Sequence, residues 1–303
     1  MDAIEQVESA VRRAAAQVGP AVVGVGPRPG SGSTGVVVGE GRVLTNAHNV
    51  TGREMTVTFA DGRSATAQLA AADVDGDIAV LTVDTGAAPG VVWSETATAV
   101  GTAVIALANP GGRGLRTTFG LVSATEQAFS GPRGRRITGS IEHTAPLARG
   151  SSGGPLLDVA GRFVGLNTNR LRGGFYLALP AHADLRDRVD ALGRGQAPRR
   201  VRLGLALAPP EVARRLRESV GLAARDGLLV RGVEDNSPAD RAGLRRGDLL
   251  VEAAGQPVST SQALFTVLDG LDATDALSLT IVRGNEEIAV SVPFTATREE
   301  GSA

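Results

Sequence analysis

Short hydrophobic segments separated by turn residues run through residues 20–180. Their length is typical of β-strands, and Asp61-Gly62 and Gly161-Arg162 stand where hairpin turns are expected. Many short strands with no helix between them predict an all-β barrel or sandwich. Examples of the predicted strands are residues 34–38, 42–45, 56–59, 65–69, 78–83, 103–108, 117–125, 135–143, 155–157, 163–167 and 175–179.

Helical spacing of hydrophobic residues occurs at both ends of this β region. Residues 3–18 predict an amphipathic helix that ends at Gly19-Pro20. Residues 181–192 predict a second helix, which carries Leu185, Val189 and Leu192 on one face.

A polar segment at 193–200 (GRGQAPRR) separates the β region from a second pattern of strands and short helices. Its Gly, Pro and Arg content is typical of a linker. In the second pattern, residues 211–219 predict an exposed helix with its charges outward. The expected organisation is an N-terminal helix at 1–19, a β domain at 20–192, the linker at 193–200, a second domain at 201–295 and a tail at 296–303.

Composition narrows the class of protein. A length of 303 residues fits two domains of roughly 150 residues each. A formal net charge of −1 gives no argument for nucleic acid, and the lack of Cys excludes disulfides and a thiolate nucleophile. No signal peptide or membrane span is predicted, since no stretch approaches the ~20 apolar residues that a membrane helix needs. The sequence as it stands predicts a cytoplasmic protein, or an exported one if an export signal was trimmed.

The strongest candidate for chemistry is GSSGGP at 150–155. A Ser between glycines permits a sharp turn whose backbone N–H groups point at one spot beside an exposed hydroxyl. The same segment is also compatible with an ordinary Gly/Ser loop that has no catalytic role. Two further segments supply what a serine nucleophile needs: His48 follows an apolar strand, and Asp77 precedes another. The imidazole takes the hydroxyl proton, and the carboxylate fixes the imidazole tautomer.

These motifs resemble the trypsin-like serine proteases of the HtrA/Deg family. The resemblance covers about residues 20–180 and implies a mostly β fold with a double β-barrel and an active site between the barrels. The matching segments are GSGSTGVVV at 30–38, VLTNAH at 43–48, DGDIAVLTV at 75–83, ALANPGG at 106–112, FGLVSA at 119–124 and GSSGGPLLDVAGRFVGLNT at 150–168.

The resemblance also implies roles for individual residues. It makes His48 the general base, Asp77 the carboxylate that orients it, and Ser152 the nucleophile, with the N–H groups of Gly150 and Ser152 as the oxyanion hole. Asp77 is preferred because it directly precedes the Ile-Ala-Val-Leu run of the family pattern. The rival carboxylates are Asp73 and Asp75.

No carboxylate that would select Lys or Arg stands in the few residues before Ser152. We therefore expect an apolar substrate pocket for small or medium aliphatic side chains, as in the family generally. No metal or organic cofactor is expected, and His143 and His182, which lie outside the motifs, are interpreted as structural. The expected lining of the pocket is Leu147, Asn167, Thr168 and Asn169.

Residues 201–294 resemble an HtrA-type PDZ domain, a smaller α+β fold, through RLGL at 202–205, SPADRAGLRRGD at 237–248 and GQPV at 255–258. Such a domain binds C-terminal peptides along a strand edge. The backbone N–H groups of Leu203, Gly204 and Leu205 would hold the peptide carboxylate. A helix at 261–268 would form the other wall, and its groove-facing candidates, for which core packing is the alternative, are Ala263, Leu264 and Val267.

Together these features predict an HtrA-type serine endopeptidase of protein quality control. It would cleave unfolded or misfolded polypeptides through an acyl-enzyme on Ser152, while the PDZ domain recruits substrate or regulates the protease. The alternative is a non-catalytic or switched-off peptide-binding chaperone with the same domains; a PDZ scaffold alone would leave the His, Asp and Ser unexplained.

A homo-oligomer is compatible with the resemblance, but family trimers use N-terminal aromatic residues, and none precedes Phe59.

Overall fold

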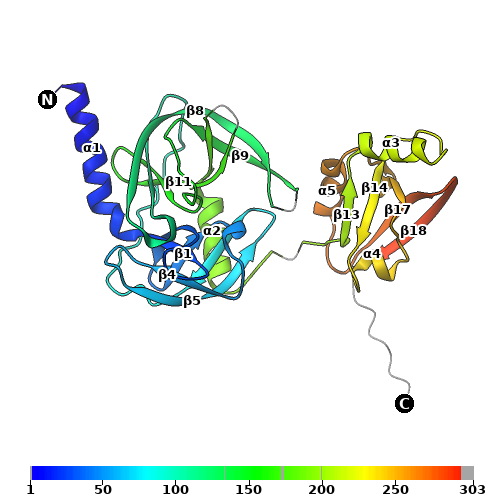
Figure 1. Cartoon of the computed structure of the whole chain (residues 1–303), viewed down its shortest axis with the longest axis horizontal. Helices are drawn as coiled ribbons and strands as arrows, with labels where there is room; N and C mark the ends of the chain where they lie inside the picture. Colours follow the sequence, from blue (N-terminus) through cyan, green and yellow to red (C-terminus); the bar gives the residue numbers. More distant parts are fainter. Residues whose placement is uncertain (1, 133, 172–173, 199, 295–303) are drawn as a thin grey trace, which may run out of the picture. The chain divides into compact units, whose positions relative to one another are not determined.

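Two closed antiparallel β-barrels make up most of the N-terminal part of the chain (Figure 1). The coordinates come from a computed structural model, which describes residues 2–132, 134–171, 174–198 and 200–294. The chain divides into two units, Met1–Ala197 and Pro198–Ala303, and the division falls within the segment 193–200. The expected tail at 296–303 lies outside the described residues.

The first barrel pairs its strands in the order β1-β2-β3-β6-β5-β4 and closes through the β1–β4 pair. Its interior is built from fully buried Val and Leu side chains such as Val23, Val43 and Leu81. The strands are β1 (Val22–Gly26), β2 (Ser33–Gly39), β3 (Arg42–Thr45), β4 (Glu54–Thr58), β5 (Ser64–Asp73) and β6 (Ile78–Thr82).

The second barrel pairs its strands in the order β10-β11-β12-β9-β8-β7 and closes through the β7–β10 pair. Leu107 and Leu166 of this barrel belong to the same buried cluster as Val23 and Val43 of the first, so one core extends across both barrels, and a second, smaller cluster around Val122 lies within the second barrel. The strands are β7 (Ala103–Ala108), β8 (Arg116–Ser130), β9 (Arg136–His143), β10 (Pro155–Asp158), β11 (Phe163–Arg170) and β12 (Tyr176–Pro180).

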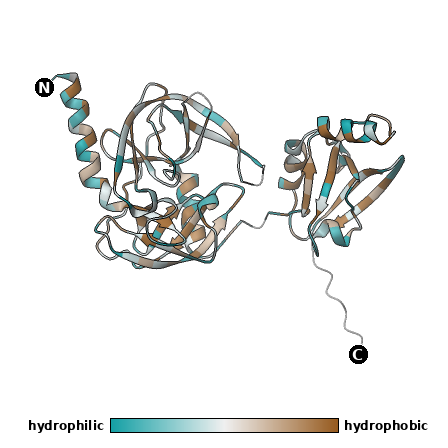
Figure 2. Cartoon of the chain, viewed as in Figure 1, coloured by the Kyte–Doolittle hydropathy of each residue, from teal (hydrophilic) through white to brown (hydrophobic). Residues whose placement is uncertain are grey.

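Two helices flank the barrels, where the hydrophobic spacing predicts them. Helix α1 (Ala3–Val18) is capped at its start by Asp2, and it buries Ala10 and Ala14 while Ile4 near its free end is 77% exposed. Hydrophobic and hydrophilic positions alternate along it in Figure 2. Helix α2 (Ala183–Gly193) follows the second barrel but packs against β5 and β6 of the first. The helix therefore connects the last strand of the second barrel to the surface of the first barrel.

The described residues of the C-terminal unit form a separate antiparallel sheet with three helices. Its strands pair in the order β13-β14-β15-β17-β18, with β16 beside β15, and its core contains Leu228, Val230 and Leu279. Its elements are β13 (Leu205–Ala208), α3 (Pro210–Ser219), β14 (Leu228–Val233), α4 (Pro238–Arg241), β15 (Leu249–Ala253), β16 (Gln256–Pro257), α5 (Ser261–Asp269), β17 (Ala276–Arg283) and β18 (Glu286–Pro293).

The predicted fold class, a mostly β double barrel followed by a smaller α+β unit, is confirmed. One expectation about α3 is wrong, because not all of its charges face outward. Arg217 is only 5% exposed, and its guanidinium donates to the carbonyl oxygens of Ala223 and Gly284. These bonds satisfy the buried cation with backbone acceptors. Within the described residues, no helix has the length and apolar composition needed to cross a membrane.

Candidate active site

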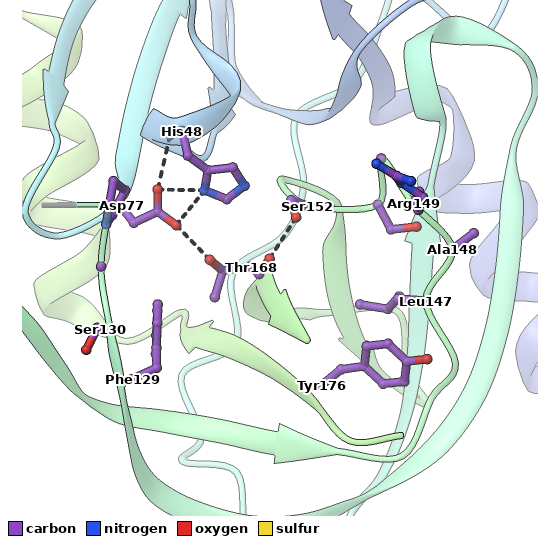
Figure 3. A pocket seen from close by; sticks show the side chains of 14 residues that line it. His48, Asp77, Phe129, Ser130, Leu147, Ala148, Arg149, Ser152, Thr168 and Tyr176 are labelled. Atoms are coloured by element: carbon purple, nitrogen blue, oxygen red, sulfur yellow. Dashed lines mark hydrogen bonds and ion pairs between the residues drawn. The ribbon is translucent and has the colours of Figure 1, made fainter. Parts of the chain in front are cut away.

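The candidate site is a cleft of about 400 Å³ to which both barrels contribute (Figure 3). His48 and Asp77 come from the first barrel, whereas Ser152 and Thr168 come from the second. The described residues that line it are His48, Asp77, Phe129, Ser130, Gly131, Pro132, Leu147, Ala148, Arg149, Gly150, Ser151, Ser152, Thr168 and Tyr176.

His48 is placed by the short 3-10 helix η2 (Ala47–Asn49) that follows β3. Its Nδ1 lies 2.9 Å from each carboxylate oxygen of Asp77, and its main-chain N–H donates to Asp77 Oδ1 over 3.2 Å. Buried Asn46 donates from Nδ2 to the Asp77 carbonyl oxygen at 3.0 Å. Because both the ring and the backbone of His48 bond to the same carboxylate, the imidazole is held with Nδ1 toward Asp77.

Asp77 stands directly before β6 in the left-handed backbone region, with φ of 54°. This conformation is uncommon for a residue with a side chain, although Asp tolerates it better than most. The side chain of Asp77 is 2% exposed, and Thr168 donates from Oγ1 to its Oδ2 over 2.7 Å. The carboxylate is therefore fixed from both barrels.

The rival carboxylates bond elsewhere. Asp73 pairs with Arg188 of α2 at 2.8 Å and accepts the Gly76 N–H at 3.0 Å. Asp75 lies 3.6 Å from the guanidinium of Arg135. In the described chain, the His48 ring bonds to Asp77 and to neither of the other two.

Ser152 lies in the second barrel, in the turn between β9 and β10. Its hydroxyl donates to the Thr168 carbonyl oxygen over 2.7 Å (Figure 3). Within the described residues, no hydrogen bond joins the Ser152 hydroxyl to the His48 imidazole. Thr168 thus bonds to Asp77 through its side chain and to Ser152 through its carbonyl.

The turn before Ser152 has the geometry of a type II β-turn. Gly150 has φ of 83°, and the Ser151 N–H donates to the Ala148 carbonyl oxygen at 3.2 Å. Thr34 Oγ1 donates to the Gly150 carbonyl oxygen at 2.8 Å, which fixes the turn to the first barrel. The N–H groups of Gly150 and Ser152 have no acceptor among the described residues, and both residues line the cleft. Two backbone donors are therefore available there for a ligand oxygen.

The expected substrate pocket is only partly found. Leu147 and Thr168 line the cleft, but Asn167 is fully buried behind it and bonds to His143 through Oδ1 at 3.0 Å. The expectation for Asn167 is wrong because β11 turns successive side chains to opposite faces. The Asn169 side chain lies outside the described part of the structure.

Sequence reasoning missed two aromatic residues of the cleft. Phe129 lies on the Asp77 side and Tyr176 below Leu147 (Figure 3). The sequence offers a signal for Tyr176, since it is the single Tyr of the chain and lies in the strand predicted at 175–179. Phe129 reaches the cleft only because β8 continues beyond the predicted strand, and no local motif indicates this.

His143 supports the wall of the cleft from inside the second barrel. Its ring is fully buried and stacks on Tyr176 with centroids 5.9 Å apart. Burial lowers the pKa of His143 to about 4, although its hydrogen bond to Asn167 acts in the opposite direction. His143 is therefore neutral near pH 7, as expected for a structural histidine, and His182 occupies the N-cap position of α2.

Some peptide-groove candidates of the C-terminal unit are at least partly exposed, and others are buried in its core. Gly204 has φ of 77°, and its carbonyl oxygen accepts the Glu234 N–H. Ala263 and Val267 are half-buried on α5, and Leu205 begins β13. Leu203 and Leu264 are core side chains, 4% and 2% exposed. The groove-facing expectation for Leu264 is therefore wrong, because the helix turns that residue toward the sheet.

Within the described residues, no group of three or more His, Asp or Glu side chains could hold a metal ion.

Two family models match the chain. The model for the trypsin-like peptidase domain matches residues 33–166, and the model for the PDZ domain matches residues 203–294. The first range includes His48, Asp77 and Ser152.

Curated relatives match across both units. A probable periplasmic serine endoprotease, DegP-like, of Halomonas elongata is 32% identical over 268 residues, which cover 86% of this chain and 55% of that protein. A chloroplastic protein named Protease Do-like 1 of Arabidopsis thaliana is 30% identical over 292 residues, covering 89% of this chain and 65% of that protein. The chain thus spans a little over half the length of these relatives.

Solved structures match over nearly the whole chain. An HtrA-type protease named AlgW, solved with a decapeptide, has a TM-score of 0.63 at 25% identity and covers 93% of this chain and 97% of that one. A serine endoprotease from Yersinia pestis has the same fold, with a TM-score of 0.62. The order of the two domains, the residues in the cleft and these matches agree: the chain belongs to the HtrA, or DegP-like, family of trypsin-like peptidases with a C-terminal PDZ domain.

Proposed function

We propose that this chain is a serine endopeptidase that cleaves unfolded or misfolded polypeptides through an acyl-enzyme on Ser152. The observation that carries the proposal is a series of hydrogen bonds at one cleft. It links His48 to Asp77, Asp77 to the Thr168 hydroxyl, and the Thr168 carbonyl to Ser152. Such a cleft brings together a base, a group that orients the base and a hydroxyl, which are the parts that serine acyl transfer requires.

In the proposed reaction, the Ser152 hydroxyl rotates from the Thr168 carbonyl oxygen toward His48 and attacks the substrate carbonyl carbon. His48 takes the hydroxyl proton through Nε2 and then gives it to the leaving amine, while Asp77 stabilises the imidazolium. The free N–H groups of Gly150 and Ser152 would receive the negative oxygen of the tetrahedral intermediate. Water then repeats the attack on the acyl-enzyme and releases Ser152.

The cleft supports an apolar preference for the residue before the cut bond. Asp77 is the one carboxylate among its described lining residues, and this carboxylate is occupied by His48 and Thr168. A substrate Lys or Arg would therefore find no partner at the cleft floor. Leu147 and Tyr176 supply apolar surface there instead.

We propose that the PDZ domain binds polypeptide C-termini. Strand β13 ends the sheet order, and among the described strands it pairs with β14 alone, so its other edge can accept an extended peptide. The loop at Leu203 and Gly204 stands directly before this edge. Binding of a peptide with a free C-terminus, and loss of binding when the same peptide is amidated, would support this role.

Intact-mass measurement after treatment with a fluorophosphonate tests the proposed nucleophile. We expect one adduct on the wild-type protein and none on Ser152→Ala, with cleavage of an unfolded protein substrate lost in the same variant. Continued cleavage by folded Ser152→Ala would contradict the assignment of the nucleophile.

A second candidate is a switched-off peptide-binding chaperone. The observation that favours it is the Ser152 hydroxyl bond to Thr168, which turns the hydroxyl away from the base. If the wild-type protein gains no fluorophosphonate adduct, even with a C-terminal peptide added for the PDZ domain, the chaperone function is supported. A single adduct on the wild type rejects it.

A further inference from the structure

Asn49 connects the histidine-bearing turn of the first barrel to the serine-bearing turn of the second. It follows His48 in the 3-10 helix η2. Its side-chain Nδ2 donates to the Ser152 carbonyl oxygen at 3.0 Å and to Thr45 Oγ1 at 3.0 Å. Both protons of the amide group are therefore used, one of them across the boundary between the barrels.

These bonds form a closed ring of four residues. Thr45 Oγ1 accepts from Asn49 and donates its own proton to the Thr34 carbonyl oxygen at 2.7 Å. The Thr34 N–H in turn donates to the Ser152 carbonyl oxygen at 3.1 Å. The Ser152 carbonyl thus accepts two hydrogen bonds from the first barrel. Rotation of the Asn49 amide would break two bonds of the ring at once.

We infer that Asn49 is a positioning residue, which fixes the backbone of Ser152 relative to His48; this inference rests on the proposed function. His48 and Ser152 must come within hydrogen-bond distance although they belong to different barrels. In the proposed reaction the Ser152 hydroxyl rotates from the Thr168 carbonyl oxygen toward His48, and this requires that the Ser152 backbone stays in place. Displacement by about 1 Å at a reacting group can lower the rate by about a hundredfold.

The space around Asn49 allows this role to be separated from packing. Asn49 is half-buried and is not among the described residues that line the cleft. A Cβ atom on Gly153 would lie 3.1 Å from the Asn49 amide nitrogen, which shows how closely the two turns approach. Leu has nearly the shape of Asn and fills the same space, but it has no donor for the Ser152 carbonyl.

The experiment compares fluorophosphonate labelling rates, peptide hydrolysis and melting temperatures of the full-length wild type, Asn49→Leu and Asn109→Ala. Asn109 is the matched control, because its Nδ2 also donates across the barrels, to the Val22 carbonyl oxygen at 3.3 Å, without touching Ser152. We expect Asn49→Leu to lower the labelling rate and kcat by ten- to a hundredfold with KM unchanged. Asn109→Ala should keep the wild-type labelling rate even if its melting temperature falls.

A wild-type labelling rate in folded Asn49→Leu would overturn the inference and leave the proposed function standing. Equal losses in Asn49→Leu and Asn109→Ala would also overturn it, since they would reflect stability alone. If Asn49→Leu fails to fold, Thr45→Val removes the hydroxyl that accepts from Asn49 and donates to the Thr34 carbonyl, so it breaks two bonds of the ring, and an unchanged kcat in that variant would overturn the inference. A wild-type protein that gains no adduct would overturn the proposed function and this inference together.

Discussion

Thr168 shows how much of the site depends on single polar atoms. Its hydroxyl donates to the buried Asp77 carboxylate, and its carbonyl oxygen accepts the Ser152 hydroxyl proton. One residue therefore orients the carboxylate and also holds the hydroxyl in its present rotamer. Departure of Ser152 toward His48 costs one hydrogen bond, worth about 1 kcal/mol net, which a new bond to the imidazole offsets.

His143 predicts a pH effect on stability. Its pKa falls from 6.5 to about 4 on burial, so between these values the unfolded chain binds a proton that the native protein does not. The free energy of unfolding therefore decreases as the pH drops from 6.5 to about 4, by up to about 3 kcal/mol. Denaturant unfolding of the wild type and of His143→Gln at several pH values checks this. His143→Gln keeps a donor for Asn167 and should lose the contribution, so parallel pH curves for the two proteins would contradict it.

Tyr176 predicts the size preference of the cleft. The residue is 6% exposed, and its ring lies between the cleft and buried His143, so it limits the depth available to a substrate side chain. Tyr176→Ala should raise kcat/KM about tenfold for peptides with Phe or Leu before the cut bond, compared with peptides that have Ala at that position. The space left by the ring lets the larger side chain bury more apolar surface in the cleft.

Phe129→Ala is the matched control for Tyr176→Ala, since it truncates an aromatic residue on the Asp77 side of the same cleft. It should leave the ratio between Phe and Ala peptides unchanged. An unchanged ratio in folded Tyr176→Ala, measured with a series of chromogenic peptides, would remove Tyr176 from the pocket floor.

At the scale of the elements, hydrophobic patterning predicts where most strands and helices lie but not where each one ends. The strand expected at 117–125 continues to Ser130, because cross-strand bonds to β9 extend it through polar positions. That extension brings Phe129 to the cleft. Strand β1 (Val22–Gly26), which is fully buried, is not among the segments named from the sequence, although the strand Ile78–Thr82, buried at four successive positions, is.

Motif and resemblance together indicate His48, Asp77 and Ser152, but the contacts that orient them are tertiary. Arg188 of α2 bonds to Asp73, and Asn49 bonds to Ser152, across more than a hundred positions of the chain in each case. No periodicity or spacing in the sequence encodes such pairs. They become visible only once the barrels have closed.

The turn from Asp73 to Asp77 predicts the effect of a glycine substitution. A Cβ atom on Gly76 would lie 1.9 Å from Arg188 Nη2 and 2.6 Å from Asp73 Oδ2, so Gly76→Ala must displace the guanidinium. We expect a loss of about 1–2 kcal/mol in the free energy of unfolding, because a charged hydrogen bond is broken. The labelling rate of Ser152 should fall as well, since this turn sets the backbone of Asp77.

Gly39→Ala serves as the control for Gly76→Ala. Gly39 ends β2 in the same barrel, and nothing lies within 4 Å of a Cβ placed there. Thermal melts and fluorophosphonate labelling of both variants give the comparison. If the two variants behave alike, the Asp73–Arg188 pair does not hold the turn.

At the scale of the whole molecule, the two units have separate hydrophobic cores. The barrel cores contain residues up to Leu192, and the cores of the second unit begin at Val201. Among the described residues, the clusters of each unit contain side chains of that unit alone. The barrels therefore carry the complete candidate site, and the PDZ domain can influence it only through contacts made outside these cores.

Removal of residues 198–303 tests this division. The remaining barrel unit should stay folded and keep fluorophosphonate labelling and hydrolysis of short peptides within a fewfold of the full chain, because all residues of the cleft remain. Any stimulation by C-terminal peptides should disappear, and cleavage of an unfolded protein should slow, because the proposed recruitment site is gone. Circular dichroism and a melting curve establish that the shortened protein is folded. A folded barrel unit without labelling would mean that the PDZ domain is needed to form the active site itself, and the two units would then have to be treated as one catalytic module.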